Sequence, residues 1–194
     1  MKKLAFVAAT ASLIAAPALA HTGHGGAEGL LNGLAHPMLG MDHLLAILAV
    51  GLWSGFVLPR HVWAGGAMFL AAMATGAGMA WSGIGLPLVE GWITLSVVVF
   101  GALTLLSRRG QAPALTGASL VAIAGFALAH GHAHAAEATG HVASYLAGFL
   151  IATAALHLAG IALARSVATG RAAHLVQGAM GAGIALGGLL LMAG

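Results

Sequence analysis

The feature that most constrains this chain is a series of apolar runs, each about as long as a helix that crosses a membrane. Six runs cover residues of about 36–57, 62–81, 88–107, 113–131, 141–164 and 172–193. A transmembrane helix needs about 20 predominantly apolar residues to cross a hydrocarbon core of about 30 Å. The short breaks between the runs force consecutive helices to be antiparallel neighbours. We therefore predict an all-α, polytopic membrane helical bundle with six transmembrane helices.

Composition excludes several other classes of protein. Of the 194 residues, 60% are hydrophobic and only 6% are charged, which is more apolar surface than a soluble domain of this size could hide. The net charge of +3 comes from seven scattered Lys and Arg residues, which form no basic patch for a nucleic acid. Because the chain has no cysteine, disulfides, thiolate nucleophiles and Cys-ligated metal sites are excluded.

The first 20 residues have the pattern of a cleaved secretory signal peptide. Lys2 and Lys3 precede an apolar stretch from Leu4 to Ala16, and Ala18-Leu19-Ala20 forms the small-residue end. An uncleaved first transmembrane helix is the alternative. Cleavage would leave residues 21–194 as one permease domain, and we expect its Gly-rich start, 21–35, to be a mobile segment outside the membrane.

Charge predicts the orientation of the helices. After residue 20, every basic residue falls in the loops after the first, third and fifth predicted helices: Arg60, Arg108, Arg109, Arg165 and Arg171. All four acids fall toward the opposite side: Glu28, Asp42, Glu90 and Glu137. The positive-inside rule then makes the arginine loops cytoplasmic and both mature termini periplasmic, in a bacterial inner (cell) membrane.

Glycine is frequent enough to predict close helix packing. Two pairs have the small-residue spacing that lets transmembrane backbones approach closely, Gly51 with Gly55 and Gly183 with Gly187. We expect both pairs to lie at helix contacts in a compact bundle.

Polar side chains open the first predicted helix, in the sequence His36-Pro37-Met38-Leu39-Gly40-Met41-Asp42-His43. An aspartate inside the membrane costs about 2.5–3.5 kcal/mol on insertion scales, so such groups normally hold something. On one continuous helix His36 and His43 lie within about 20° of each other, with Asp42 on the flank. We predict that they converge on a divalent cation; a structural polar contact between helices is the alternative.

A second cluster of the same composition ends the fourth predicted helix. His130, His134 and Glu137 are spaced i, i+4, i+7 and fall on one helical stripe. If the first and fourth helices meet, six residues offer donors to one or two ions: His36, Asp42, His43, His130, His134 and Glu137. Nitrogen with carboxylate oxygen suits Ni(II), Co(II) or Zn(II). His132 and His141 lie off the stripe and can be read as polar loop residues.

Two further polar residues lie apart from these clusters. His157 falls near the middle of the fifth predicted helix, where it could be a relay point on a conduction path or a hydrogen-bonded core histidine. Glu90, at the external start of the third helix, is a weaker candidate for the site where an ion enters.

The two motifs together resemble the HupE/UreJ family. The resemblance rests on His36-Pro37, Gly40, Asp42 and His43, on the second cluster, on the signal sequence and on the six spans. The resemblance implies a permease for nickel or cobalt that has no prosthetic group and binds the metal through these six residues. Such a permease would indirectly supply metal for the maturation of nickel hydrogenase or urease. The chain departs from the family pattern at Ala129 and Ala135, where Phe and Gly are usual.

The expected function is uptake of Ni(II), or of Co(II), driven by the membrane potential or the metal gradient. The chain has no Walker-type phosphate-binding motif. One alternative is an intramembrane zinc-dependent hydrolase, although a zincin would have Glu where this chain has Gly131. The other is a non-transporting assembly partner of a metalloenzyme. The expected partners are the divalent ion and the lipid bilayer, and a homo-oligomer is left open.

Overall fold

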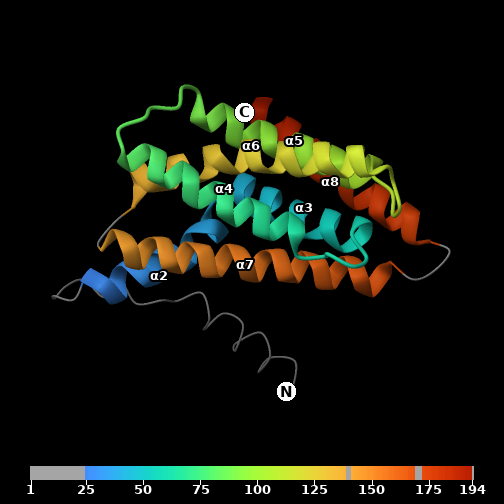
Figure 1. The fold of residues 1–194 in the computed structure, drawn as a ribbon, viewed down its shortest axis with the longest axis horizontal. Coiled ribbons are helices and arrows are strands. Elements are labelled where there is room, and N and C mark those ends of the chain that lie inside the picture. Colours follow the sequence, from blue (N-terminus) through green and yellow to red (C-terminus); the bar gives the residue numbers. More distant parts are fainter. Residues whose placement is uncertain (1–24, 139–140, 169–171, 194) are drawn as a thin grey trace, which may run out of the picture.

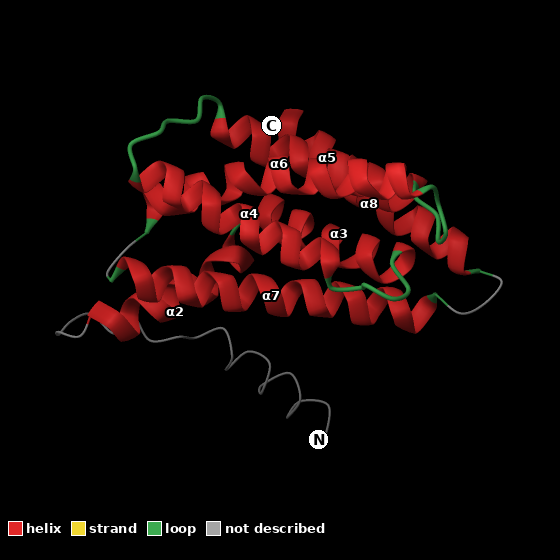
Figure 2. Cartoon of the chain, in the orientation of Figure 1, coloured by secondary structure: helices red, strands yellow, loops and turns green. Residues whose placement is uncertain are grey.

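A computed structural model describes residues 25–138, 141–168 and 172–193 of the chain. The predicted signal peptide, 1–20, and the expected new N-terminus at His21 lie outside the described residues. The described residues contain only helices and the loops between them (Figure 2), which confirms the all-α prediction. The helices are α2 (Gly25–Leu39), α3 (Met41–Val57), α4 (Ala64–Trp81), α5 (Val89–Leu106), α6 (Pro113–Glu137), α7 (Val142–Val167) and α8 (Ala173–Ala193).

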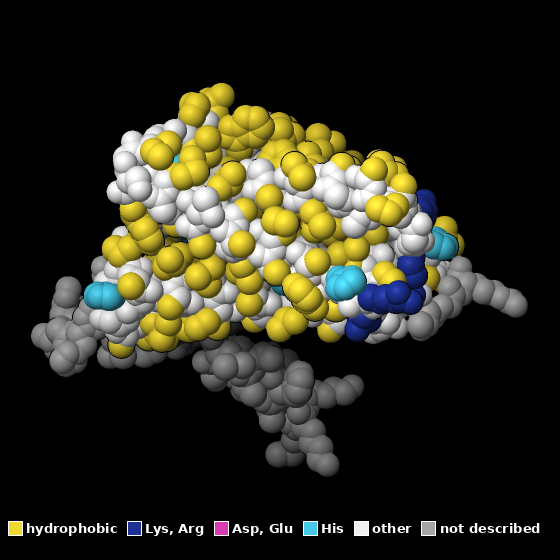
Figure 3. All heavy atoms as spheres, in the orientation of Figure 1, with side chains coloured by type: hydrophobic (Ala, Val, Ile, Leu, Met, Phe, Trp, Pro, Cys, Tyr) yellow, Lys and Arg dark blue, Asp and Glu magenta, His cyan; other side chains and the backbone are white. Residues whose placement is uncertain are grey.

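Five of the described helices, α4 to α8, are each long and apolar enough to cross a membrane, and α2 with α3 passes the same test as a bent pair, which makes six spans if the pair is one broken span. The helices lie side by side in one bundle (Figure 1). Arg60 follows α3, Arg108 and Arg109 follow α5, and Arg165 lies in the last turns of α7. The Lys and Arg side chains visible in Figure 3 accordingly gather at one end of the molecule. That this end faces the cytoplasm stays a prediction.

The first span is broken, which corrects the prediction of one continuous helix over 36–57. Between α2 and α3 the axis bends by 82°. The break falls at Gly40, whose backbone is extended (φ −98°, ψ 120°). Pro37, three residues earlier, has no N–H to donate and disfavours a continuous helix. Residues 25–35 belong to α2. The prediction of a mobile segment over 21–35 is therefore also wrong for residues 25–35.

Three pairs of glycines bring helices into backbone contact by the same geometry. A Cβ atom at Gly76 in α4 would clash with the carbonyl of Leu128, and one at Gly131 in α6 with the carbonyl of Met73. Gly76 and Gly131 are thus a pair in which each glycine faces the carbonyl three residues before the other glycine. This is the arrangement of parallel helices whose Cα atoms and carbonyls approach closely. The second and third pairs join α2 and α3 to α7: Gly33 with Gly148, and Gly51 with Gly160. These contacts place both halves of the broken span along α7.

The two predicted glycine motifs have different outcomes. Gly51 and Gly55 both lie against α7, which confirms the first motif. The second is wrong for Gly183, since nothing described lies within 4 Å of a Cβ there, whereas a Cβ at Gly187 would lie 3.3 Å from the Leu45 side chain in α3. In α8 the close contacts are made by Gly181, against Gly101 and Leu105 in α5, and by Gly188 against Val98. These two glycines are seven residues apart and so lie on the face of α8 that meets α5.

The fourth span extends beyond its predicted end at 131, because α6 continues to Glu137. The residues after Gly131 are Ala, His and Glu, which include no helix breaker, and Trp81 at the end of α4 donates its indole N–H to the Ala135 carbonyl (3.4 Å). This extra length keeps His130, His134 and Glu137 on one continuous helix.

Candidate metal-binding site

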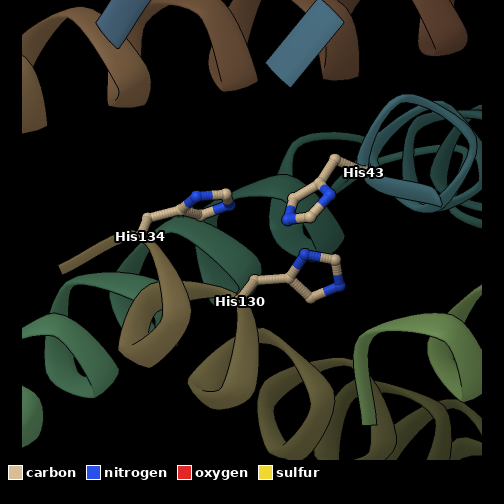
Figure 4. Close-up of side chains that lie close together, drawn as sticks. All are labelled: His43, His130 and His134. Carbon is tan, nitrogen blue, oxygen red and sulfur yellow. The ribbon is translucent and has the colours of Figure 1, made fainter. Parts of the chain in front are cut away.

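Three imidazoles converge between the start of α3 and the last turns of α6. They belong to His43, His130 and His134, and one ring nitrogen from each lies within 4.8 Å of the others. Figure 4 shows the three rings pointing toward one another from the two helices. All three residues are buried, with 9%, 1% and 2% of their surface exposed. We refer to them as the three-histidine group.

Each of these histidines has one ring nitrogen without a hydrogen-bond partner among the described residues: Nε2 of His43, Nδ1 of His130 and Nε2 of His134. A buried polar atom left unpaired costs about 1–3 kcal/mol. Three such atoms in one place therefore indicate a site that is completed by a ligand.

Carboxylates orient two of the three rings. The Nδ1–H of His43 donates to Asp42 Oδ1 (2.7 Å), which also accepts from the His43 backbone N–H (2.8 Å). The Nδ1–H of His134 donates to Glu137 Oε2 (3.3 Å). Because a neutral imidazole has one N–H and one lone pair, both contacts leave the lone pair on Nε2, which faces the group. A carboxylate behind the ring is a common support for metal-ligating histidine.

Ser96 in α5 orients the third ring. Its hydroxyl donates to the Ile93 carbonyl (2.6 Å) and lies 3.0 Å from Nε2 of His130. Since a hydroxyl has a single hydrogen, Ser96 must accept from His130, so Nε2 carries the proton. The lone pair of His130 is then on Nδ1, the atom that faces His43 and His134.

A second group lies next to the first and shares His134 with it. His36 in α2, His134 and Glu137 also have ligand atoms within 4.8 Å of one another. His36 Nε2 is 3.1 Å from Glu137 Oε2, and these two side chains are 28% and 49% exposed. This outer group therefore connects the buried histidines to the surface of the bundle.

Aromatic rings enclose the histidines. The ring centre of Phe149 in α7 is 4.0 Å from that of His134, and Tyr145 is 5.8 Å from His36. On the other side, Phe69 in α4 is 5.4 Å from His130. An apolar lining excludes water and strengthens the electrostatic interaction between the lone pairs and a cation.

The structure thus brings together five of the six predicted ligands in two groups, and it places Asp42 behind His43. The convergence does not come from one helical stripe, because the break at Gly40 separates His36 from His43. Ser96, Phe69, Tyr145 and Phe149 were missed from the sequence. Ser96 could have been found, because an isolated serine in an apolar run indicates a polar contact inside the bundle. The three aromatic residues could not, because aromatic residues in such runs usually belong to the core.

The other predicted polar residues lie outside both groups. His132 binds the Ile84 carbonyl (2.8 Å), and His141 caps the start of α7 by accepting from the Ser144 N–H (3.4 Å). Glu90 is in the first turn of α5. His157 is buried in α7 with 3% of its surface exposed.

The fold and the site define a polytopic helical membrane protein with histidines and carboxylates gathered between its spans. The chain belongs to the HupE/UreJ family, whose model, described as "HupE / UreJ protein", matches residues 8–191. It is similar to "Protein HupE" of Rhizobium leguminosarum bv. viciae, with 38% identity over 196 residues that cover 99% of this chain and 100% of that protein. No solved structure matches the chain.

Proposed function

We propose that this protein is a permease that takes up a divalent transition metal, Ni(II) in the first place and Co(II) in the second. The ion is captured at the outer group and passes to the three-histidine group, where three imidazole nitrogens bind it. The observation that supports this most directly is the convergence of three buried lone pairs, each on a ring held by a partner behind it.

The donor types favour these metals. Imidazole nitrogen with a carboxylate oxygen suits borderline divalent ions, and the chain has no thiolate that would favour Cu(I). The resemblance to the HupE/UreJ family favours nickel and cobalt among them. We assign Asp42 a positioning role, through His43, and direct metal contacts to His36, His43, His130, His134 and Glu137.

The arrangement also lowers the electrostatic barrier to a divalent ion. Asp42 and Glu137 lie next to the histidines and supply two negative charges. The membrane potential adds about 2.3 kcal/mol per charge per 100 mV, so a divalent ion that crosses the bilayer gains about twice that amount. Sequestration of the metal inside the cell would make uptake directional.

The test is uptake of radioactive nickel, with cobalt in parallel, into vesicles that contain the purified protein. We expect the wild type to take up nickel and His43→Ala and His130→Ala to lose at least about tenfold in rate, the effect typical of weakening a metal site. His132→Ala is the matched control, because His132 lies on the same helix but binds the Ile84 carbonyl outside both groups.

Two results would contradict the proposal. Equal uptake by the wild type and both variants would show that these histidines do not bind the transported ion. Hydrolysis of a lipid or amide that chelators abolish, without nickel uptake, would favour the zinc-dependent hydrolase instead, since three histidines are also a known ligand set of catalytic zinc.

A further inference from the structure

Unpaired polar atoms continue into the bundle beyond the three-histidine group. Among the described residues, the buried side-chain atoms without a partner also include Ser54 Oγ, Tyr145 OH, Thr153 Oγ1 and His157 Nε2. Such atoms are rare in protein interiors, and each one calls for an explanation. Three of these four belong to α7.

Their spacing places them on one stripe of α7. Tyr145, Phe149, Thr153 and His157 follow one another at steps of four residues, so each is adjacent to the next, and the stripe turns by about 40° around the helix at every step. Tyr145 and Phe149 contact His36 and His134. Each step of four residues advances about 6 Å, so the stripe leads from the metal-binding groups toward the arginine-bearing end of the bundle.

His157 has the same bonding pattern as the three histidines. Its Nδ1 lies 2.9 Å from the Ile47 carbonyl, which can only accept, so Nδ1 donates and the lone pair is on Nε2. The residue is 3% exposed. If His157 were purely structural, its bond to Ile47 would be enough. Its Nε2 would then be a polar atom buried in an apolar interior without a partner and without a role.

One aromatic ring connects His157 to the three-histidine group, and an apolar pocket that exposed Trp63 and Leu158 help to line borders it. The Phe69 ring is 5.4 Å from His130 and 5.1 Å from His157, so one aromatic ring contacts both histidines. A pocket of about 210 Å³ borders His157 between α4 and α7, with Gly66 and Ala154 in its lining. Further along α3, Ser54 continues the series of unpaired atoms.

We propose that Nε2 of His157 is an inner binding site for the transported divalent cation, between the three-histidine group and the arginine-bearing end of the bundle. This inference rests on the proposed function. An ion that leaves the three-histidine group would pass Phe69 and Thr153, exchange an imidazole ligand for the imidazole of His157, and continue past Ser54 with water as its remaining ligands.

The test compares two substitutions in full-length protein in vesicles, by nickel uptake. His157→Asn keeps an N–H near Ile47 but has no atom at the position of Nε2. His157→Gln places a polar amide near that position but loses the bond to Ile47. We expect His157→Asn to lower the maximal uptake rate about 10- to 100-fold, the range for weakening a metal site, and His157→Gln to lower it less.

Nickel binding by the detergent-purified protein separates this inference from the proposed function. The half-saturating nickel concentration of the three-histidine group should be unchanged in His157→Asn, and His174→Asn, an exposed histidine in α8, should match the wild type. If the wild type transports nickel and His157→Asn transports it equally fast, the inner site is wrong while the permease stands. A slower His157→Gln than His157→Asn would assign His157 a structural role instead.

A measurement on the wild type covers the case in which both variants fail to fold. Crystals soaked in nickel and measured at the nickel absorption edge should show anomalous density at His157 Nε2 as well as at the three-histidine group. Density at the three-histidine group alone, at saturating nickel, would overturn the inner site. Density at neither would contradict the proposed function itself.

Discussion

In the metal site that we propose, Asp42 contributes without facing the metal. Its carboxylate binds both the ring and the backbone N–H of His43, and so fixes the orientation of that ring and the position of its lone pair. Sequence alone indicated that Asp42 belonged to the site, because an acid in an apolar run needs a reason. Its role behind His43 depends on side-chain geometry at a helix start, which residue spacing does not determine.

Replacing Asp42 tests this positioning role. Asp42→Asn removes the negative charge and weakens the acceptor of the His43 N–H, so nickel affinity should fall about 10- to 100-fold, as for other supporting groups behind metal ligands. Equilibrium dialysis of the purified protein measures it. Glu28→Gln is the control, since Glu28 is an exposed acid in the first turn of α2. Equal affinity in Asp42→Asn and wild type would count against the role.

Among the helices, the contact between α4 and α6 positions two of the three histidines. Gly131 lies between His130 and His134 and meets the Met73 carbonyl, so the height and rotation of α6 depend on this glycine. The length of the apolar runs predicted these helices well. The prediction that consecutive helices are neighbours is wrong for α4 with α5 and for α6 with α7, because the closest packing joins α4 to α6, α5 to α8, and α7 to α2 and α3. In a Gly-rich chain many helix pairs have suitable spacing, so the spacing does not select the partner.

A methyl group at this contact should disturb the site. Gly131→Ala forces α6 away from α4 at a cost of about 1–3 kcal/mol for overpacking, and should weaken nickel binding along with thermal stability. Gly125→Ala on the same helix is the matched control, because nothing described lies within 4 Å of a Cβ there. Thermal unfolding and nickel binding of both variants measure the effect; two variants that behave alike would rule out the packing argument.

The break in the first span is a feature of the site that was not predicted from the sequence. The clustering of His36, Asp42 and His43 was visible in the sequence, and the structure does bring His36 and His43 to within 6.1 Å between ring centres. The continuous helix from which that proximity was argued does not exist. Pro37 followed by Gly40 inside an apolar run was the available signal of a break. Broken helices are common where membrane proteins bind ions, since the interrupted backbone lies against a polar site.

All the described arginines lie at one end of the bundle, where Figure 3 shows the visible Lys and Arg side chains. The candidate metal-binding groups lie at the start of α3 and the end of α6, nearer the other end. If the arginine-bearing end is cytoplasmic, metal is captured outside and released inside. Because the chain has no cysteine, single cysteines can report this orientation directly. Gly85→Cys, between α4 and α5, should react with a membrane-impermeant maleimide added to intact cells.

Ala112→Cys, at the arginine-bearing end just before α6, is the paired variant for this topology test. It should react only after the membrane is permeabilised. Labelling of Ala112→Cys but not of Gly85→Cys in intact cells would reverse the direction of transport that we propose.

X-ray absorption at the nickel edge tests most directly whether α3 and α6 bind one ion together. In the nickel-loaded, purified wild type we predict multiple scattering from imidazole rings around the metal, and clearly weaker imidazole scattering in the double variant His43→Ala/His130→Ala. A wild-type spectrum with oxygen ligands alone, or an imidazole signal of equal strength in both proteins, would contradict a nickel site made by these histidines.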